Sequence, residues 1–133
     1  MKQHSQTAPY RFYLVFMLLA CTGALIWQLW LPQLAEFYSI WGIAAGWQRE
    51  IALWNVGLIA SILYALAKHD VRWMKALTFQ STVLCWALGT NHLFAFISSF
   101  SSGKWIHMLG VLEVMLLGGI WGIVVLVRYK NIR

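Results

Sequence analysis

Charged side chains are scarce in this chain of 133 residues. Only 11% of its residues are charged and only four are acidic, whereas 61% are hydrophobic. Soluble domains average roughly 25% charged residues. A chain of this length forms one domain, and one soluble domain could not bury so much apolar surface inside itself. The composition therefore excludes an ordinary water-soluble fold and predicts a single membrane-embedded domain over residues 1–133.

Strand-like alternation of apolar and polar residues is also missing. Instead, four stretches carry almost no charge, at residues 12–31, 51–67, 76–98 and 105–127. Crossing a hydrocarbon layer of about 30 Å takes roughly 20 helical residues, and each stretch is close to that length. A helix also satisfies its own backbone hydrogen bonds, which lipid cannot do. We therefore predict an all-α fold, an integral membrane four-helix bundle.

The ten Lys and Arg residues are distributed unevenly between the two predicted membrane faces. Arg49 and Lys104 fall on one face, and the other eight fall on the face of the two termini and the second connection. These eight are Lys2, Arg11, Lys68, Arg72, Lys75, Arg128, Lys130 and Arg133. Basic residues are enriched on the cytoplasmic side, so both termini and the loop at 68–75 are predicted to be cytoplasmic. This orientation accounts for the net charge of +6 without nucleic-acid binding.

The first connection is not purely polar. Leu34, Phe37, Tyr38 and Trp41 follow Pro32 with the spacing i, i+3, i+4 and i+7. In a helix this spacing places the four side chains on one face. The pattern predicts a short amphipathic helix at the outer membrane surface, between the first and second spans.

Recognisable catalytic and metal-binding motifs are absent from the sequence. There is no G-x-S-x-G nucleophile motif, and the histidines and acids have no spacing diagnostic of a metal site. Cys21 and Cys85 lie near mid-membrane, and we interpret them as small buried side chains rather than a disulfide or a metal pair. No metal site and no reaction are predicted, and the sequence leaves open whether the chain is an enzyme.

Polar groups inside the spans are the strongest indication of a site, because a charged residue at a helix centre costs roughly 2.5–3.5 kcal/mol. Three of the four spans carry such groups within the helix or next to its outer end. These groups lie in the outer half of the bundle, in a layer on the order of 10 Å thick. They are Arg49, Glu50, Asn55, Asn91, His92, His107 and Glu113. Such a layer is typical of a site that opens to the outer side.

A purely structural role is the alternative interpretation of the same groups. Arg49 can pair with Glu50 or Glu113. His92 can hydrogen-bond with Glu113 or Asn55, and such bonds fix the register of neighbouring helices. The sequence leaves both interpretations open.

The segment 40–50, which reads I-W-G-I-A-A-G-W-Q-R-E, is followed by Asn55 and Gly57. It resembles an uncharacterised group of small bacterial four-helix membrane proteins, in which an I-G-W stretch precedes F-Q-R-E-V. That group also has Gly followed by His on the third helix, matched here by Gly89 and His92. The broader architecture is similar to DoxX-like proteins, some of which are small membrane subunits of quinone-linked oxidoreductases.

The resemblance covers roughly residues 36–98, and the flanking helices match only in hydropathy. The chain departs from the group at Trp47, where the group has Phe, and at Ile51 and Ala52, where it has Val-Gly. The resemblance implies a bacterial inner membrane location. The site residues that it implies are Gln48, Arg49, Glu50, Asn55 and His92.

We therefore expect an outward-facing polar pocket that binds a quinone or another amphipathic small molecule. An apolar cleft edged by a few polar groups suits such a ligand. The candidate ligand-binding residues are Gln48, Arg49, Glu50, Asn55, His92, His107 and Glu113. If a redox partner exists, the chain would be its membrane subunit.

Two other functions fit the same pattern. In a proton-coupled transporter, Glu113 would be the exchangeable carboxyl group. In a purely structural subunit of a membrane complex, the polar groups would only hold the helices together. Gly118 and Gly122 permit close helix approach, either within the bundle or between two copies. A protein partner or a homodimer therefore stays open alongside the lipid bilayer and a small ligand.

Overall fold

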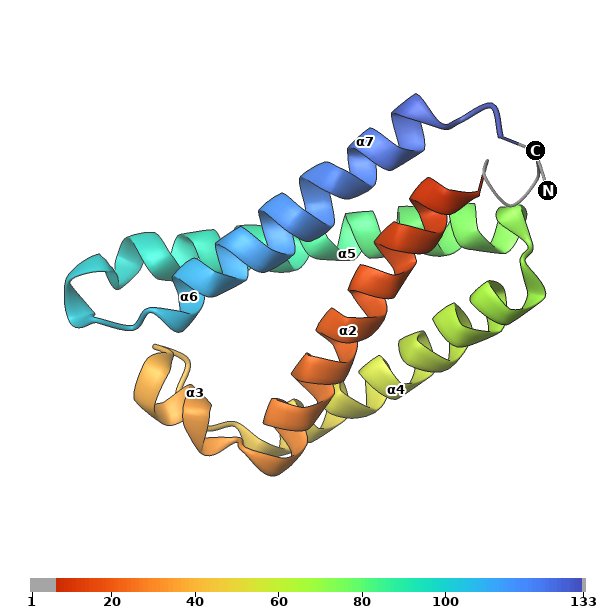
Figure 1. Cartoon of the computed structure of the whole chain (residues 1–133). Helices are drawn as coiled ribbons and strands as arrows, with labels where there is room; N and C mark the ends of the chain where they lie inside the picture. Colours follow the sequence, from red (N-terminus) through yellow and green to blue (C-terminus); the bar gives the residue numbers. More distant parts are fainter. Residues whose placement is uncertain (1–6, 133) are drawn as a thin grey trace.

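The computed structural model of the chain describes residues 7–132 (Figure 1). These residues form helices and turns with no strand, which confirms the predicted all-α fold. In chain order the elements are α2 (Ala8–Trp30), α3 (Gln33–Tyr38), α4 (Ala45–Lys68), α5 (Val71–Ser98), η1 (Phe100–Ser102), α6 (Ile106–Leu109), η2 (Gly110–Ile120) and α7 (Trp121–Arg128). The last three form one continuous helix, whose middle part, η2, is wound as a π-helix.

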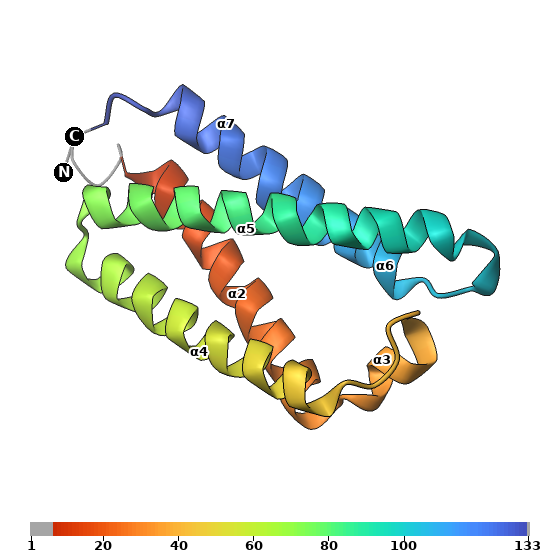
Figure 2. The same cartoon turned by 180° about the vertical axis from the view of Figure 1, so that it is seen from behind.

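The long helices are arranged as two antiparallel pairs. α4 packs along α2, and the continuous helix α6–η2–α7 packs along α5 (Figures 1 and 2). A tight turn joins the pairs. His69 reverses the chain there with a positive φ of 54°, and the Asp70 carboxylate then accepts a hydrogen bond from the backbone N–H of Arg72 at 2.8 Å. This capping bond satisfies one of the free N–H groups at the start of α5.

The start of α2, the α4–α5 turn and the end of α7 meet at one end of the molecule. Tyr10 donates a hydrogen bond to the Tyr129 carbonyl at 3.2 Å, and Lys75 donates to two carbonyls of the segment after α7. This basic end carries Arg11, Lys68, Arg72, Lys75, Arg128 and Lys130. Of the basic residues predicted to share one face, Lys2 and Arg133 lie outside the described residues. The opposite end is called the α3 end below.

The hydrophobic core lies where the two pairs meet, toward the basic end. The residues that α2 contributes to it are Tyr10, Tyr13, Leu14, Met17 and Cys21, each at most 5% exposed. No residue of α2 beyond Cys21 is buried. The two pairs therefore diverge toward the other end, where α3 lies between them (Figure 1).

Glycines allow the last helix to approach α5 closely. A Cβ added at Gly118 would collide with Cys85 Sγ, and one added at Gly122 would collide with Thr82 Oγ1. Tyr13 of α2 reaches the same contact, where its hydroxyl donates to the Gly118 carbonyl at 2.9 Å. The Gly118-x-x-x-Gly122 pattern is thus used for packing within the chain.

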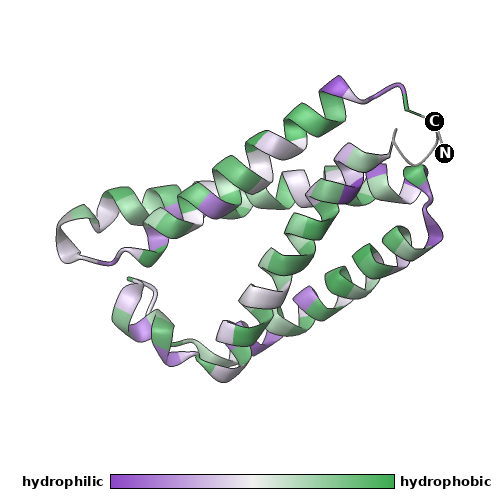
Figure 3. Cartoon of the chain, viewed as in Figure 1, coloured by the Kyte–Doolittle hydropathy of each residue, from purple (hydrophilic) through white to green (hydrophobic). Residues whose placement is uncertain are grey.

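Three helices are long and apolar enough to span a membrane, namely α2, α4 and the continuous helix Ile106–Arg128. Figure 3 shows hydrophobic residues along most of their length and hydrophilic residues at the α4–α5 turn. The expected span at 76–98 lies within α5, which is long enough at 28 residues but is not among the three. The prediction of four spans is therefore corrected to three candidates within residues 7–132, because Gln80, Asn91 and His92 lower the hydropathy of α5.

The short amphipathic helix expected after Pro32 is confirmed as α3, for which Pro32 is the N-terminal capping residue. The helix ends at Tyr38, because Ser39 adopts an extended backbone conformation with ψ of 150°. The expectation that Trp41 continues the same helical face is therefore wrong, and Trp41 lies in the segment that follows α3.

A substitution at Gly122 tests the close helix contact. Gly122→Ala places a methyl group against Thr82 and the Tyr13 hydroxyl, so we expect a loss of about 1–3 kcal/mol of stability. The measurement is thermal unfolding of the purified protein in detergent. Gly57→Ala is the matched control, because a Cβ there meets no atom within 4 Å and helix propensity then favours Ala. Equal melting temperatures for the two variants would refute the contact.

Candidate functional site

Two histidines from neighbouring helices face each other at the α3 end. His107 of α6 is fully buried, and its Nδ1 lies 3.4 Å from the Nδ1 atom of His92, which is half-buried on α5. The two ring centroids are 5.6 Å apart. Because α5 and α6 are antiparallel neighbours joined by η1, residues near the end of one helix meet residues near the start of the other.

The segment after α3 closes over this pair. The backbone N–H of Ile40 donates to His107 Nε2 at 3.1 Å, and Ser39 Oγ lies 3.3 Å from the same nitrogen. The Trp41 ring stands 4.5 Å from the His107 ring and 4.9 Å from the His92 ring, centroid to centroid. We refer to Ser39, Ile40, Trp41, His92 and His107 as the histidine cluster.

The hydrogen bonds determine which ring nitrogens carry protons. Because Ile40 N–H is a donor, Nε2 of His107 must accept and therefore carries no hydrogen. In a neutral His107 the hydrogen is then on Nδ1, which donates to Nδ1 of His92. A doubly protonated His107 would present a hydrogen to the Ile40 N–H and lose that bond. The cluster thus needs a neutral His107, and both of its nitrogens are used within the chain.

Gly110 makes room for His92. A Cβ at this position would collide with the imidazole ring of His92. The sequence places Gly110 three residues after His107, but it gives no sign that the reason is space for a ring on another helix. The contributions of Ser39, Ile40 and Gly110 to the cluster were missed for the same reason.

Gln48, implied as a site residue by the family resemblance, is buried and holds the chain between α2 and α4. Its side-chain amide donates to the Pro32 carbonyl at 3.3 Å, and its Oε1 accepts from the Ala44 N–H at 3.3 Å. Ala44 is the residue that precedes α4, so Gln48 caps its own helix. Both polar ends of the amide are therefore occupied.

The other predicted site residues are not gathered into one cluster. Arg49, Glu50 and Glu113 are exposed and Asn55 is half-buried, and none of the four has a hydrogen bond or ion pair among the described residues. The pairings expected for Arg49 with an acid, and for His92 with Glu113 or Asn55, are absent from residues 7–132. The ion pair found there joins Arg72 to Asp70 at 3.7 Å, at the basic end.

Four buried side-chain atoms have no hydrogen-bond partner among residues 7–132, namely Gln28 Oε1, Thr78 Oγ1, Ser81 Oγ and Trp86 Nε1. Of these, Gln28 Oε1 lies near the end of α2. A buried amide oxygen without a partner is unusual and calls for an explanation. Its signal in the sequence is an amide within an otherwise apolar helix, next to Trp27 and Leu29.

The described residues hold no group of three or more His, Cys, Asp or Glu side chains that could bind a metal ion. Cys21 and Cys85 are free thiols, 5% and 3% exposed. Cys85 Sγ lies 3.9 Å from Met17 Sδ, within the core. The cysteines are therefore placed as packing residues, as the sequence predicts.

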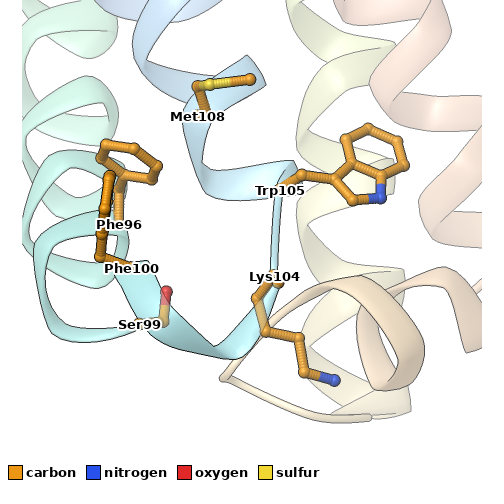
Figure 4. Close-up of a pocket in the computed structure, with 7 residues that line it drawn as sticks. Phe96, Ser99, Phe100, Lys104, Trp105 and Met108 are labelled. Atoms are coloured by element: carbon orange, nitrogen blue, oxygen red, sulfur yellow. The ribbon is translucent and has the colours of Figure 1, made fainter.

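A small pocket of about 170 Å³ opens at the α3 end between η1 and α6 (Figure 4). Phe96, Phe100 and Met108 give it an apolar side, and Lys104 lies at its rim. The Lys104 ammonium group is already bound, because it donates to the carbonyls of Glu36 at 3.1 Å and Phe37 at 2.7 Å. Pockets for drug-sized ligands are usually about 300–1,000 Å³, so this one is too small for a quinone ring with its tail.

Comparison of the chain with protein-family models, curated proteins and solved structures finds no match. The resemblance to the DoxX-like family therefore stays a prediction. The function has to be argued from the geometry of the chain.

Replacing His107 tests the role of the histidine cluster. His107→Leu removes the acceptor of the partly buried Ile40 N–H and the bond between the two histidine rings, a loss of about 1–3 kcal/mol. We expect the segment 39–44 to open more often and its amide hydrogen exchange in lipid nanodiscs to accelerate roughly tenfold or more. The control is Met108→Leu, a change at the neighbouring exposed residue. Unchanged exchange in His107→Leu would show that the cluster does not hold this segment.

Proposed function

We propose that the chain is a small bacterial inner-membrane protein whose outer half binds an amphipathic small molecule, with a quinone as the candidate ligand. The observation that carries the proposal is a set of polar groups without partners on three helices, near the end where the helix pairs diverge. They are the Gln28 amide oxygen, Asn55 and Glu113.

The positions of these groups fit a ligand that enters from the α3 end. Gln28 lies two residues before the end of α2, and Asn55 and Glu113 lie ten and seven residues inside α4 and the last helix. At 1.5 Å per residue all three are within roughly 15 Å of the α3 end of their helices. An unpaired carboxyl group at membrane depth is costly, and membrane proteins retain such groups chiefly at functional positions.

The histidine cluster supports a positioning role beside this region. Its nitrogens are used to hold the segment after α3 against α6, so His92 and His107 are not proposed as direct ligand contacts. Instead, they fix the position of α3, which lies between the diverging pairs (Figure 2). A ligand would reach Asn55 and Glu113 past this segment.

The redox part of the proposal depends on the resemblance to DoxX-like proteins, some of which are membrane subunits of quinone-linked oxidoreductases. In such an assembly this chain would bind the quinone, and a partner protein would carry the electron-transferring group. An apolar site with a few polar groups suits the quinone ring, whose two carbonyl oxygens accept hydrogen bonds from an amide or a protonated carboxyl group.

Glu113 also favours a second candidate function, proton-coupled transport. It is exposed and unpaired on a candidate span, as an exchangeable carboxyl group must be. The packing at the basic end argues against this function. Tyr10, Tyr13 and Leu14 are fully buried in the core there and block access from that side. Transport needs access from both faces, so a large rearrangement of α2 would be required.

The proposed orientation places the basic end in the cytoplasm, following the positive-inside rule. Gln33→Cys on α3 should then react with a membrane-impermeant thiol reagent added outside the cell, whereas Arg72→Cys should react only after the membrane is opened. The native thiols are buried, so the unmodified chain serves as the unlabelled control. The reverse labelling pattern would refute the orientation.

Native mass spectrometry of the protein released from mild detergent tests ligand binding. We expect a co-purified quinone-sized molecule on the unmodified protein and roughly two- to tenfold lower occupancy in Glu113→Leu, because Leu has no donor for the quinone carbonyl and a neutral hydrogen bond contributes about 0.5–1.5 kcal/mol. Glu36→Gln is the control, since it removes a carboxyl group from the exposed surface of α3. Bulk lipid alone on all three proteins would reject the proposal.

A further inference from the structure

The exposed face of α5 carries polar side chains that have no partner in the chain. Gln80 and Asn91 are exposed, and neither has a hydrogen bond among residues 7–132. α5 packs along the candidate span Ile106–Arg128, so its middle part lies at the same depth in the membrane. When the 28 residues of α5 are centred on a hydrocarbon layer of about 30 Å, the side-chain amides of both residues lie inside that layer.

The exposed residues of this face recur with alternating steps of four and three. The series is Gln80, Leu84, Ala87, Asn91, Phe94 and Ser98, and every member is exposed. This is the heptad spacing with which two helices pack side by side as a left-handed pair. The face lies opposite the buried side of α5, which includes Thr78, Cys85 and Gly89, and in Figure 2 no other element covers the helix.

We propose that this face, called the α5 face, is the interface of a homodimer. Two copies inserted in the same orientation are related by a two-fold axis perpendicular to the membrane, so their α5 helices run parallel. Each residue of the face then meets its own counterpart at the same depth. Gln80 pairs with Gln80 of the second copy, and Asn91 with Asn91.

Amide groups suit such an interface because they are self-complementary. Each carries both a donor and an acceptor, so two identical amides satisfy one another across the axis. Polar side chains of this kind associate membrane helices, and a small residue between them lets the backbones come close. Ala87 occupies that position between Gln80 and Asn91.

Other faces of the chain lack this symmetry. The face of the last helix that carries Glu113 would bring two carboxyl groups together across a two-fold axis, and like charges repel. Gly118 and Gly122, which could promote association, are already buried against α5. The exposed face of α4 presents Leu53 and Trp54, which lipid can cover without loss of hydrogen bonds.

Disulfide cross-linking in membranes tests the proposed geometry. Ala87→Cys places a thiol beside the two-fold axis, so oxidation should convert most of the protein into a covalent dimer. Leu53→Cys is the matched control, because it is 59% exposed on α4 at a similar depth. The native cysteines are buried and provide the background in the unmodified protein. Cross-linking of Ala87→Cys no stronger than that of Leu53→Cys would overturn the proposal.

The amides themselves are tested by the double variant Gln80→Leu/Asn91→Leu. We expect the dimer dissociation constant, measured by energy transfer between labelled copies diluted in lipid bilayers, to rise about tenfold or more, because interhelical hydrogen bonds contribute about 0.6 kcal/mol each and up to about 1.7. Leucine favours insertion into the membrane, so failed insertion does not explain such a loss. Gln33→Leu removes an exposed amide from α3, away from the α5 face, and should leave the constant unchanged.

Each remaining outcome is decisive. An unmodified protein that stays monomeric in bilayers, or that associates only with a different protein, overturns the homodimer. A dimer that the double variant leaves intact overturns the role of the α5 face. Both measurements are independent of any bound ligand.

Discussion

Lipid supplies no hydrogen-bond partner, and this constraint determines where the polar groups of the chain lie. Hydroxyl groups in the helices mostly donate to the carbonyl one turn earlier, as Thr22 does to Leu18 and Ser61 to Gly57. Tyr13 instead joins two helices through its bond to the Gly118 carbonyl. The core at the basic end therefore combines apolar packing with buried hydrogen bonds of the Tyr13 hydroxyl, to the Gly118 carbonyl and to Thr82 Oγ1, which position α2 against the last helix and α5.

The same constraint separates the polar residues of the α3 end into two groups. His107 and Gln48 are bound within the chain, where they hold the segments that follow and precede α3. Asn55, Glu113 and the Gln28 amide oxygen have no such partner. The first group maintains the architecture, and the second group is the basis of the proposed ligand site. Gln80 and Asn91 on α5 also lack a partner among residues 7–132, and the proposed homodimer would satisfy them across a two-fold axis.

Much of the architecture could be predicted because it depends on composition along the chain. The apolar stretches identify α2, α4 and the last helix, and the apolar spacing after Pro32 identifies α3. Trp41 was misplaced because the helical pattern continues beyond the true end of α3, where bonds to His107 impose an extended backbone. α5 was predicted as a fourth span from its lack of formal charge, but Gln80, Asn91 and His92 keep its mean hydropathy below that of the three candidate spans.

The sequence by itself determined the all-α fold, the candidate membrane-spanning helices and the concentration of basic residues at one end, because hydropathy and charge act locally along each helix. Only the tertiary structure decided which polar groups are satisfied. His107 accepts a hydrogen bond from the Ile40 N–H, which lies 67 residues earlier in the sequence. Position 110 requires a glycine because the ring of His92 occupies the space beside it. Such contacts depend on how helices rotate and cross, and neither angle is encoded in the periodicity of any single segment.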